Sequence, residues 1–346
     1  MKIIVFVATY LLLISFGVPV AVHAADPGWI TSCGYSHSLA DDPIIFPGQP
    51  GLAHLHDFAA ARTANAFSTP LSLRAGGTTC MIPGDKSSYW VPALYKNGVR
   101  VLPNATSHDA LFYYRRKGAP SGTTVQPFPQ GLKIIIGNAH AKSPAENPQL
   151  GTDIIFKCGP GSSTDLPAPP TQCSSGVMVM SLRFPNCWDG VNLDSPDHRS
   201  HMAYPRSGRC PASHPVVVPR LESFFRYPVG TEPIGTITLS SGPYYTAHQD
   251  FFNAWEPSAL QALLDKCINA LVDCGTNPEV NMGTTPSPTP IREDVNGDQK
   301  IDLDDLSILL ANFGKINASK SEGNIAGNDI VVNSIDLTTL LSAFGR

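Results

Sequence analysis

Runs of alternating or β-prone residues recur along most of this chain and are separated by turn residues, a pattern that predicts strands. The runs are SYWVPALY, DALFYYRR, LKIIIGN, TDIIFKC, GVMVMSLRF, HPVVVPRLESFFRYPV and IGTITLSS. Only Pro257–Asn269 has apolar residues at helical spacing, with a proline at its start. Because strands without intervening helices form antiparallel sheets, we predict a mainly β fold, a jelly-roll-like β-sandwich with long loops and a C-terminal helix.

Two further patterns divide the chain. Residues 1–24 carry a lysine at position 2, continue through an apolar run and end in small residues, as a signal peptide does, so the mature chain is expected to start near Ala25. Residues 277–290 are rich in Thr, Ser and Pro and predict a stiff, extended linker. We therefore expect a large β domain over 25–276 and a small domain over 291–346.

Composition and charge limit the classes of partner that the chain can be expected to bind. The 346 residues include 28 acidic residues against 24 Lys plus Arg, and the segment 291–346 accounts for the whole excess. The large domain is thus close to neutral and has no basic stripe, so a nucleic-acid partner is not expected. No other apolar stretch is long enough to span a membrane, so the predicted location is extracellular, without a membrane partner after signal cleavage.

Eight cysteines agree with export, because scattered cysteines without CxxC pairs favour disulfides over zinc sites. Their spacing does not determine the connectivity. Pairing between sequence neighbours is the simplest hypothesis: Cys158 with Cys173, Cys187 with Cys210, and Cys267 with Cys274.

Residues 291–346 contain a calcium-loop pattern followed by an amphipathic helix. In an EF-hand loop, alternating side chains converge on one hard cation and position 7 contributes its carbonyl. Positions 1, 3, 5, 7, 9 and 12 are occupied here by Asp294, Asn296, Asp298, Lys300, Asp302 and Asp305. The segment Ile301–Gly314 recurs 31 residues later as Val332–Gly345. The pattern predicts a small all-α domain that binds Ca²⁺.

A duplicated calcium loop and helix at the end of an exported chain resembles a type I dockerin, and this resemblance implies a cohesin-like scaffold protein as partner. The second loop departs from the pattern. Counted back from Asp336 it begins at Ile325, or at Asn324 if it is one residue longer, and neither residue is acidic. Weak or absent calcium binding is expected there. Leu303 and Asp304 stand where dockerins commonly carry a hydroxyl pair, so the identity of the partner stays open.

Three short polar motifs lie outside the predicted strand cores. The motifs HLHD, DHRSH and HQD contain His54 and His56, His198 and His201, and His248. Residues i and i+2 of a strand face the same way, so the two histidines of HLHD can reach one ligand. One histidine alone is more often an ordinary hydrogen-bonded residue, whereas three such motifs together predict a shared site. An unidentified metal bound by His54, His56 and His248 is one form of that site.

The segment 184–205 (FPNCWDGVNLDSPDHRSHMAYP) is the densest in reactive groups and has too much Pro, Gly, Asn and Asp for a helix. We expect its first half to be a structural anchor, with Cys187 bridged. The second half, from Asp194 to His201, is where we expect the chemistry.

These motifs carry a resemblance to a known family. HLHDF, SSYWVPALY, FYYRR, PFPQGLKIIIGN, FPNCWDGVNLDSPDHRSHMAYP, CPASHPVVVPRL and HQDFFNAW, in this order, are similar to the DUF1996 family, a domain of unknown function common in secreted fungal proteins. The family commonly has HGDFxNGW, whereas Gln249 and Ala254 replace the two glycines here. The loss of backbone freedom implies a reshaped turn near His248. The resemblance implies no reaction.

The features together favour a secreted polysaccharide-active enzyme, a hydrolase or a lyase, tethered through its calcium-dependent dockerin-like domain. Acid and base groups, with arginine as a cation for a uronic carboxylate, suit such chemistry. The catalytic candidates are His54, His56, Asp194, Asp197, His198, Arg199, His201, His248 and Asp250, with Asp189 as a further acid. The aromatic residues expected to stack on sugar rings are Trp90, Tyr113, Tyr114, Trp188 and Trp255.

A non-catalytic glycan-binding or cell-wall structural module is the alternative. In that case the same aromatic residues bind the glycan, and the CWDG segment is only a braced scaffold. The two classes differ in one structural expectation: an enzyme brings His54, His198 and His248 to one cleft, whereas a binding module spreads them apart.

Overall fold

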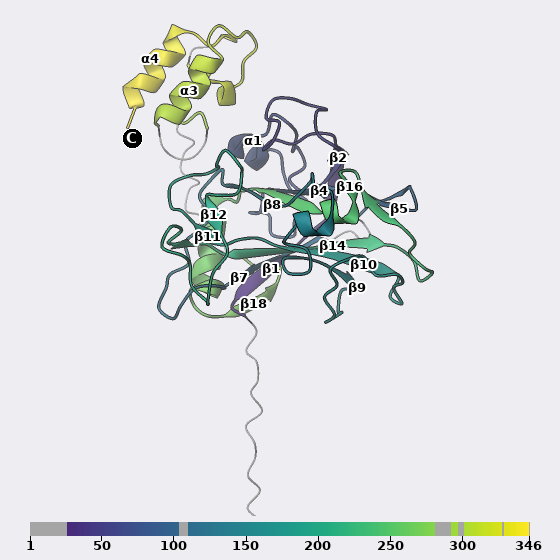
Figure 1. The fold of residues 1–346 in the computed structure, drawn as a ribbon. Helices are drawn as coiled ribbons and strands as arrows, with labels where there is room; N and C mark the ends of the chain where they lie inside the picture. The colour runs from purple at the N-terminus through teal and green to yellow at the C-terminus, as the bar shows by residue number, and fades with distance from the viewer. Residues whose placement is uncertain (1–25, 104–109, 281–291, 297–300, 327–328, 346) are drawn as a thin grey trace, which may run out of the picture.

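A computed structural model gives the fold (Figure 1) and describes residues 26–103, 110–280, 292–296, 301–326 and 329–345. The expected signal peptide, residues 281–290 of the expected linker, and the loop residues Asp298 and Lys300 lie outside the described residues. No helix within these ranges is long and apolar enough to cross a membrane.

The prediction of a mainly β fold is confirmed. A six-stranded sheet has the order β18-β1-β7-β14-β10-β9, in which only the β1–β18 pair is parallel. Its strands, in chain order, are β1 (Gly28–Cys33), β7 (Ala110–Arg115), β9 (Ile154–Cys158), β10 (Val177–Arg183), β14 (Arg220–Pro228) and β18 (Asp273–Thr276). Four of these strands fall in the runs that the hydrophobic pattern marked.

A five-stranded antiparallel sheet of order β2-β3-β4-β17-β8 carries the histidine motifs. Its strands are β2 (Tyr35–Leu39), β3 (His56–Ala60), β4 (Ser88–Pro92), β8 (Lys133–Gly137) and β17 (His248–Phe252). Two small sheets complete the strands: β5 (Leu94–Lys96), β6 (Val99–Val101), β15 (Ile237–Leu239) and β16 (Gly242–Pro243) in one, and β11 (Cys187–Trp188), β12 (Met202–Ala203) and β13 (Val216–Val217) in the other.

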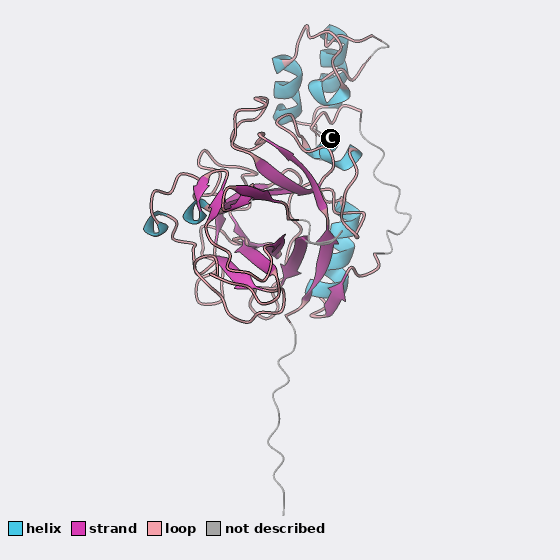
Figure 2. Cartoon of the chain, turned by 90° about the vertical axis from the view of Figure 1, so that its right-hand side faces the viewer, coloured by secondary structure: helices cyan, strands magenta, loops and turns pink. Residues whose placement is uncertain are grey.

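The two large sheets share one hydrophobic core, and Figure 2 shows the strands ranged around a central interior. Tyr89 of β4 stacks on Phe112 of β7 with ring centroids 3.8 Å apart, and Phe112 meets Phe225 of β14 edge to face. Burial of each such ring stabilises the fold by about 1.5–3 kcal/mol. The strand orders establish several sheets around one core, but they do not establish jelly-roll connectivity.

The opposite face of the five-stranded sheet is also covered, by the segment that leads from β2 to β4. A second cluster of buried apolar residues there contains Phe58, Trp90 and Ile135 from the strands, together with Ile44 and Leu73 from the covering segment. The helix α1 (Pro70–Ala75) lies in this segment. The sheet is therefore buried on both faces, and polar groups that it carries on the covered face are removed from water.

The helix predicted at 257–269 is present. It begins as α2 (Pro257–Leu263), with a proline in its first turn, and continues as the π-helical segment η3 (Leu264–Ile268). The remaining helices of the described chain are the short η1 (Pro144–Glu146), η2 (Tyr244–Thr246) and η4 (Lys320–Glu322), and the C-terminal α3 (Leu303–Ala311) and α4 (Ser334–Ala343).

The reshaped turn expected from Gln249 and Ala254 does not occur. Gln249 lies in the middle of the regular strand β17, where it is fully buried. Ser223 of β14 donates its hydroxyl to the Gln249 carbonyl oxygen, so this side chain connects the two large sheets. A buried polar side chain with such a partner braces the core.

Three disulfides join Cys33 to Cys80, Cys187 to Cys210 and Cys267 to Cys274. Two of the three predicted neighbour pairs are thus correct. The third is not formed: Cys158 and Cys173 are free thiols. The Cys187–Cys210 bridge closes the segment 184–205 at one end, as the sequence suggested.

The helices α3 and α4 repeat the same local construction. Asp305 accepts hydrogen bonds from the backbone N–H groups of Val295 and Asn296, and Asp336 accepts them from Ile325 and Ala326. Val295 and Ile325 are therefore equivalent, and both are buried in one small apolar cluster. This equivalence aligns Asn324 with the first loop position, so the second loop is one residue longer than the first.

Candidate functional site

Three histidine side chains from two distant segments meet on the covered face of the five-stranded sheet. His56 opens β3 and His248 opens β17, whereas His54 lies just before β3. Nε2 of His248 is 3.1 Å from Nε2 of His54 and 3.4 Å from Nε2 of His56. The HLHD and HQD motifs thus form one cluster, and His54 is its most accessible member.

Backbone carbonyls fix the orientation of two of these rings. Nδ1 of His56 lies 2.9 Å from the carbonyl oxygen of Asp41, and Nδ1 of His248 lies 2.8 Å from that of Thr246. A carbonyl oxygen only accepts hydrogen bonds, so both Nδ1 atoms carry the proton. The Nε2 atoms therefore present their lone pairs to the centre of the cluster.

Burial also keeps the cluster neutral. It lowers the pKa of His54 to about 4 and that of His248 to about 3, and it lowers the pKa of His56 well below its ordinary value. The neighbouring imidazoles lower the pKa values of His56 and His248 further. Neutral imidazole is the form that binds metals or accepts a proton.

Two buried carboxyl groups adjoin His56. One oxygen of Asp42, one of Asp250 and a ring nitrogen of His56 all lie within 4.8 Å of one another. Burial raises the pKa of both carboxyl groups, and the charge of Asp42 raises that of Asp250 further. Oδ2 of Asp250 has no hydrogen-bond partner among the described residues. Two carboxyl groups whose raised pKa values favour the protonated form therefore lie beside the histidine cluster.

The loop 193–201 flanks the free edge of β8, the strand next to β17. The N–H groups of Lys133 and Ile135 donate to the carbonyl oxygens of Leu193 and His198, at 2.9 and 3.4 Å. The guanidinium of Arg199 donates to the carbonyl oxygen of Gly137 at 2.8 Å. Because Gly137 pairs with His248 across the strands, the loop lies one strand away from the histidine cluster.

His198 is held by this loop rather than by the cluster. Its Nδ1 lies 2.9 and 3.0 Å from the two oxygens of Asp194. The backbone of His198 is left-handed, with φ +56°, a conformation that costs energy in a residue with a Cβ. The expectation that an enzyme brings His54, His198 and His248 to one cleft is met for His54 and His248, whereas the ring of His198 is bonded to Asp194 in the loop.

Other residues of the loop brace it. Asp197 accepts hydrogen bonds from Ser200 and Ser195 and from the Arg199 N–H, and these bonds, that of the Ser200 N–H foremost, lower its pKa. His201 is buried between Ser195 and the carbonyl oxygen of Lys133. Asp197 and His201 thus hold the shape of the loop. Asp189 caps the turn at residues 191–192, outside the cluster, in the same way.

The aromatic candidates separate by burial. Trp90, Tyr114 and Trp255 are fully buried in the two cores, so their rings cannot stack on a sugar in this structure. Trp188 is half-buried, and its indole N–H donates to the carbonyl oxygen of Asn192. Tyr113 lines a solvent-open hollow.

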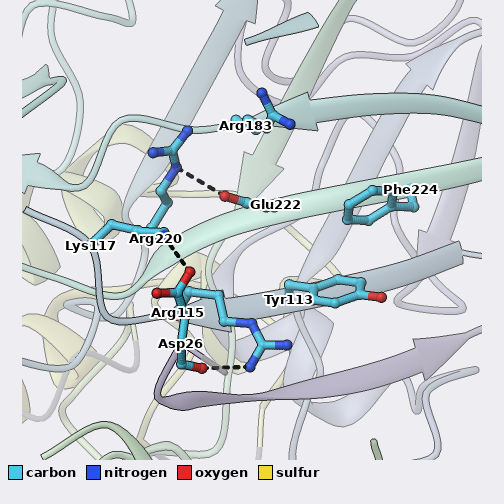
Figure 3. Close-up of a pocket in the computed structure, with 8 residues that line it drawn as sticks. All are labelled: Asp26, Tyr113, Arg115, Lys117, Arg183, Arg220, Glu222 and Phe224. Atoms are coloured by element: carbon cyan, nitrogen blue, oxygen red, sulfur yellow. Dashed lines mark hydrogen bonds and ion pairs between the residues drawn. The ribbon is translucent and has the colours of Figure 1, made fainter. Parts of the chain in front are cut away.

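That hollow lies on the outer face of the six-stranded sheet and has a volume of about 470 Å³. Figure 3 shows the rings of Tyr113 and Phe224 side by side, with arginine side chains beside them. The ring centroids are 4.7 Å apart. The other lining residues are Asp26, Arg115, Lys117, Arg183, Arg220 and Glu222, and their charges are engaged in ion pairs with one another or with nearby acids.

The candidate calcium ligands are described only in part. Asp302 caps α3, and Asp305 is fully buried and accepts three backbone N–H groups, including that of Asp302. Asp294 is buried, whereas Asn296 is partly exposed. Of the six candidate ligands, the structure describes Asp294, Asn296, Asp302 and Asp305. The carboxylate of Asp305 connects the backbone on both sides of the undescribed residues 297–300.

Sequence reasoning missed two residues near the cluster. Asp42 has no motif around it, and only the folding of its segment over the sheet brings it to His56. The charge of His140 contributes to the lowered pKa of both His54 and His248, so His140 also lies nearby. Its position two residues after the predicted strand run 132–138 was the one signal available.

These features define an antiparallel β protein with a three-histidine centre beside the edge of a sheet. The chain belongs to the DUF1996 family, described as a domain of unknown function, which matches residues 42–255. The match confirms the resemblance and contains every catalytic candidate, from His54 to Asp250, but not the C-terminal repeat. No curated protein and no solved structure matches the chain.

Proposed function

We propose that this protein is a secreted polysaccharide-active enzyme, and that its reaction is an elimination on a uronate-bearing glycan, which makes it a lyase. The observation that carries the proposal is that three distant segments gather around two neighbouring strands: His54 and His56 lie against His248 at the start of β17, and the loop 193–201 is bonded to the adjacent strand β8. Reactive loops held by a rigid sheet are the usual setting of active sites.

The carboxyl groups argue for a lyase over a glycoside hydrolase. A hydrolase needs two carboxyl groups about 5–5.5 Å or about 6.5–9.5 Å apart, on either side of an accessible bond. Asp42 and Asp250 are both buried, with oxygens within 4.8 Å of each other. Asp197 accepts several hydrogen bonds that favour its ionised form, so it is a poor proton donor.

The exposed groups of the loop suit an elimination. In this proposal His198 takes the proton from the carbon beside the uronic carboxylate, and Asp194 orients its ring. The electron pair left behind forms the new double bond as the glycosidic carbon–oxygen bond breaks. The leaving oxygen then receives the proton from the imidazolium. Arg199, exposed and anchored on Gly137, binds the carboxylate and stabilises its charge in the transition state.

A screen of uronic and neutral polysaccharides tests the proposal. His198→Asn is the informative variant, because asparagine tolerates a left-handed backbone but is no base. We expect unsaturated products from the wild type and a loss of about 10²–10⁴-fold in turnover in the variant. Ser207→Asn, at another exposed loop residue with positive φ, is the matched control and keeps full activity.

Two other outcomes are decisive against elimination. New reducing ends without a double bond identify a hydrolase. Binding of a glycan without any product identifies a non-catalytic glycan-binding module, the second candidate. The hollow around Tyr113 and Phe224 favours that candidate, because paired rings with hydrogen-bonding charges beside them suit a sugar chain. Tyr113→Ala would then abolish binding, whereas His198→Asn would not.

The C-terminal segment is part of the same proposal. We propose that 291–346 is a small all-α domain whose first loop binds Ca²⁺ and that it tethers the enzyme to a cohesin-like scaffold protein. Its support is the repeated construction of α3 and α4, in which Asp305 and Asp336 each fold the preceding loop. Export, a jelly-roll topology for the large domain and a stiff linker over 277–290 are proposed with it.

A further inference from the structure

We infer that His54, His56 and His248 bind one divalent transition-metal ion through their Nε2 atoms. The inference rests on the geometry of these three side chains and does not depend on the reaction being an elimination. It names the ligand atoms and the chemical class of the ion.

The first argument is that two lone pairs face each other. His56 and His248 each donate Nδ1–H to a backbone carbonyl, at 2.9 and 2.8 Å, so neither Nε2 carries a proton. These bare Nε2 atoms are only 3.4 Å apart and buried. Two acceptors at this distance repel each other unless a cation lies between them. Carbonyls that orient the far nitrogen of a histidine are the usual second layer of a metal site.

The second argument is size. A tetrahedral ion with metal–nitrogen bonds of about 2.0–2.1 Å separates its nitrogen ligands by about 3.4 Å. The two Nε2 distances in the cluster, 3.1 and 3.4 Å, are close to this separation. All three ligand atoms lie within 4.8 Å of one another. Small movements of the rings therefore suffice to bind an ion.

The third argument is ligand chemistry. Three neutral imidazoles suit Zn²⁺, Co²⁺, Ni²⁺ or Cu²⁺ and not the hard ions Ca²⁺ or Mg²⁺, which prefer oxygen. Asp42 and Asp250 lie beside His56, and a bound cation would stabilise their ionised forms. His54 is partly exposed while His56 and His248 are buried, so a fourth position opens toward the side of His54. Three protein ligands and one open position are typical of catalytic sites.

The experiment uses the full mature chain, expressed without a histidine tag, in buffer that contains Ca²⁺ to occupy the C-terminal loop. A chelator removes bound metal from the chain, which is then titrated with Zn²⁺. Elemental mass spectrometry measures how much metal each chain binds. We expect one Zn²⁺ per chain, a higher melting temperature with Zn²⁺, and a tetrahedral visible spectrum with Co²⁺.

His54→Ala is the test variant because its side chain is only partly buried, and we expect at least a tenfold loss of Zn²⁺ affinity with the apo melting temperature little changed. His214→Ala, a histidine outside the cluster, is the control and keeps the metal. The inference is overturned if the wild type binds no Zn²⁺, or if His54→Ala binds it as tightly. Metal binding without turnover leaves the inference standing and removes the proposed reaction, whereas turnover by a chain that binds no Zn²⁺ does the reverse.

Discussion

Asp85 provides a sharp test of the core between the sheets, because it is a carboxyl group buried there without a cation. Tyr89 donates its hydroxyl to the two oxygens, at 2.8 and 3.1 Å, and the N–H of Ser87 donates to one of them at 3.2 Å. The hydroxyl of Tyr114 lies 3.4 Å away. Burial raises the pKa of Asp85 to about 7, because it outweighs these hydrogen bonds.

The sign of the effect on stability follows from this shift. The folded chain holds the proton of Asp85 more tightly than the unfolded chain, whose pKa is near the ordinary 3.8. The contribution of Asp85 is therefore fully present below pH 4 and is lost as the pH rises to 7. A pKa that is higher by about three units in the folded chain corresponds to a loss of about 4 kcal/mol in the free energy of unfolding across this pH range.

Asp85→Asn cannot ionise, so it removes this dependence. We expect its unfolding free energy, measured by urea denaturation from pH 4 to 8, to fall less steeply with pH than that of the wild type. Asparagine places an N–H₂ group where an acceptor stood, which lowers stability equally at every pH. Asp265→Asn, at an exposed position, is the control and keeps the wild-type slope.

The comparison must be made as a difference between variant and wild type, because other buried carboxyl groups with raised pKa values add slopes of the same sign: Asp42, Asp57 and Asp250. If the two curves run parallel between pH 4 and 7, Asp85 is ionised in the folded chain and the reasoning is wrong.

Three other predictions follow from the fold. Removal of the Cys33–Cys80 disulfide, which closes a loop with a sequence separation of 47, lowers the free energy of unfolding by about 4 kcal/mol. Removal of Cys267–Cys274, with a separation of 7, lowers it by only about 2–3 kcal/mol, and chemical denaturation measures both losses. Gly137→Ala, whose Cβ would meet backbone atoms of residues 247–248 at 2.3–2.6 Å, weakens Zn²⁺ binding, whereas Gly98→Ala, with open space around it, does not. Calcium raises the helicity of a 291–346 fragment, and an unchanged circular dichroism spectrum contradicts the calcium loop.

The strands were predictable because their signal is local. Alternation along β7 and β14 and the apolar run of β10 are visible without knowledge of any neighbour. The burial of Trp90 was not, because its side of the sheet is closed by the segment that leads from β2 to β4, and nothing local in the sequence shows that this segment folds over the sheet. An aromatic residue on a strand looks the same in sequence whether water or a covering loop lies beside it.

The candidate site was predictable to the same extent. The motifs HLHD and HQD predicted that their histidines share one site, and the i, i+2 spacing within HLHD was the useful signal. Asp42 was invisible because its role comes from packing alone. His201 resembled a catalytic residue in sequence but braces the loop in the structure, since the same residue type serves both purposes.

The loop 193–201 covers an edge of the five-stranded sheet, and this role is independent of any catalytic function. β8 is the last strand of its sheet, and an uncovered edge invites pairing with other chains. The loop occupies that edge, since the backbone groups of Lys133, Ile135 and Gly137, alternate residues on the free side, are each bonded to it. Covering the edge is also what carries His198 and Arg199 to within one strand of His248. The same backbone bonds therefore cover the edge and hold the flank of the histidine centre, so variants that loosen the loop should lower stability together with any activity of the proposed site.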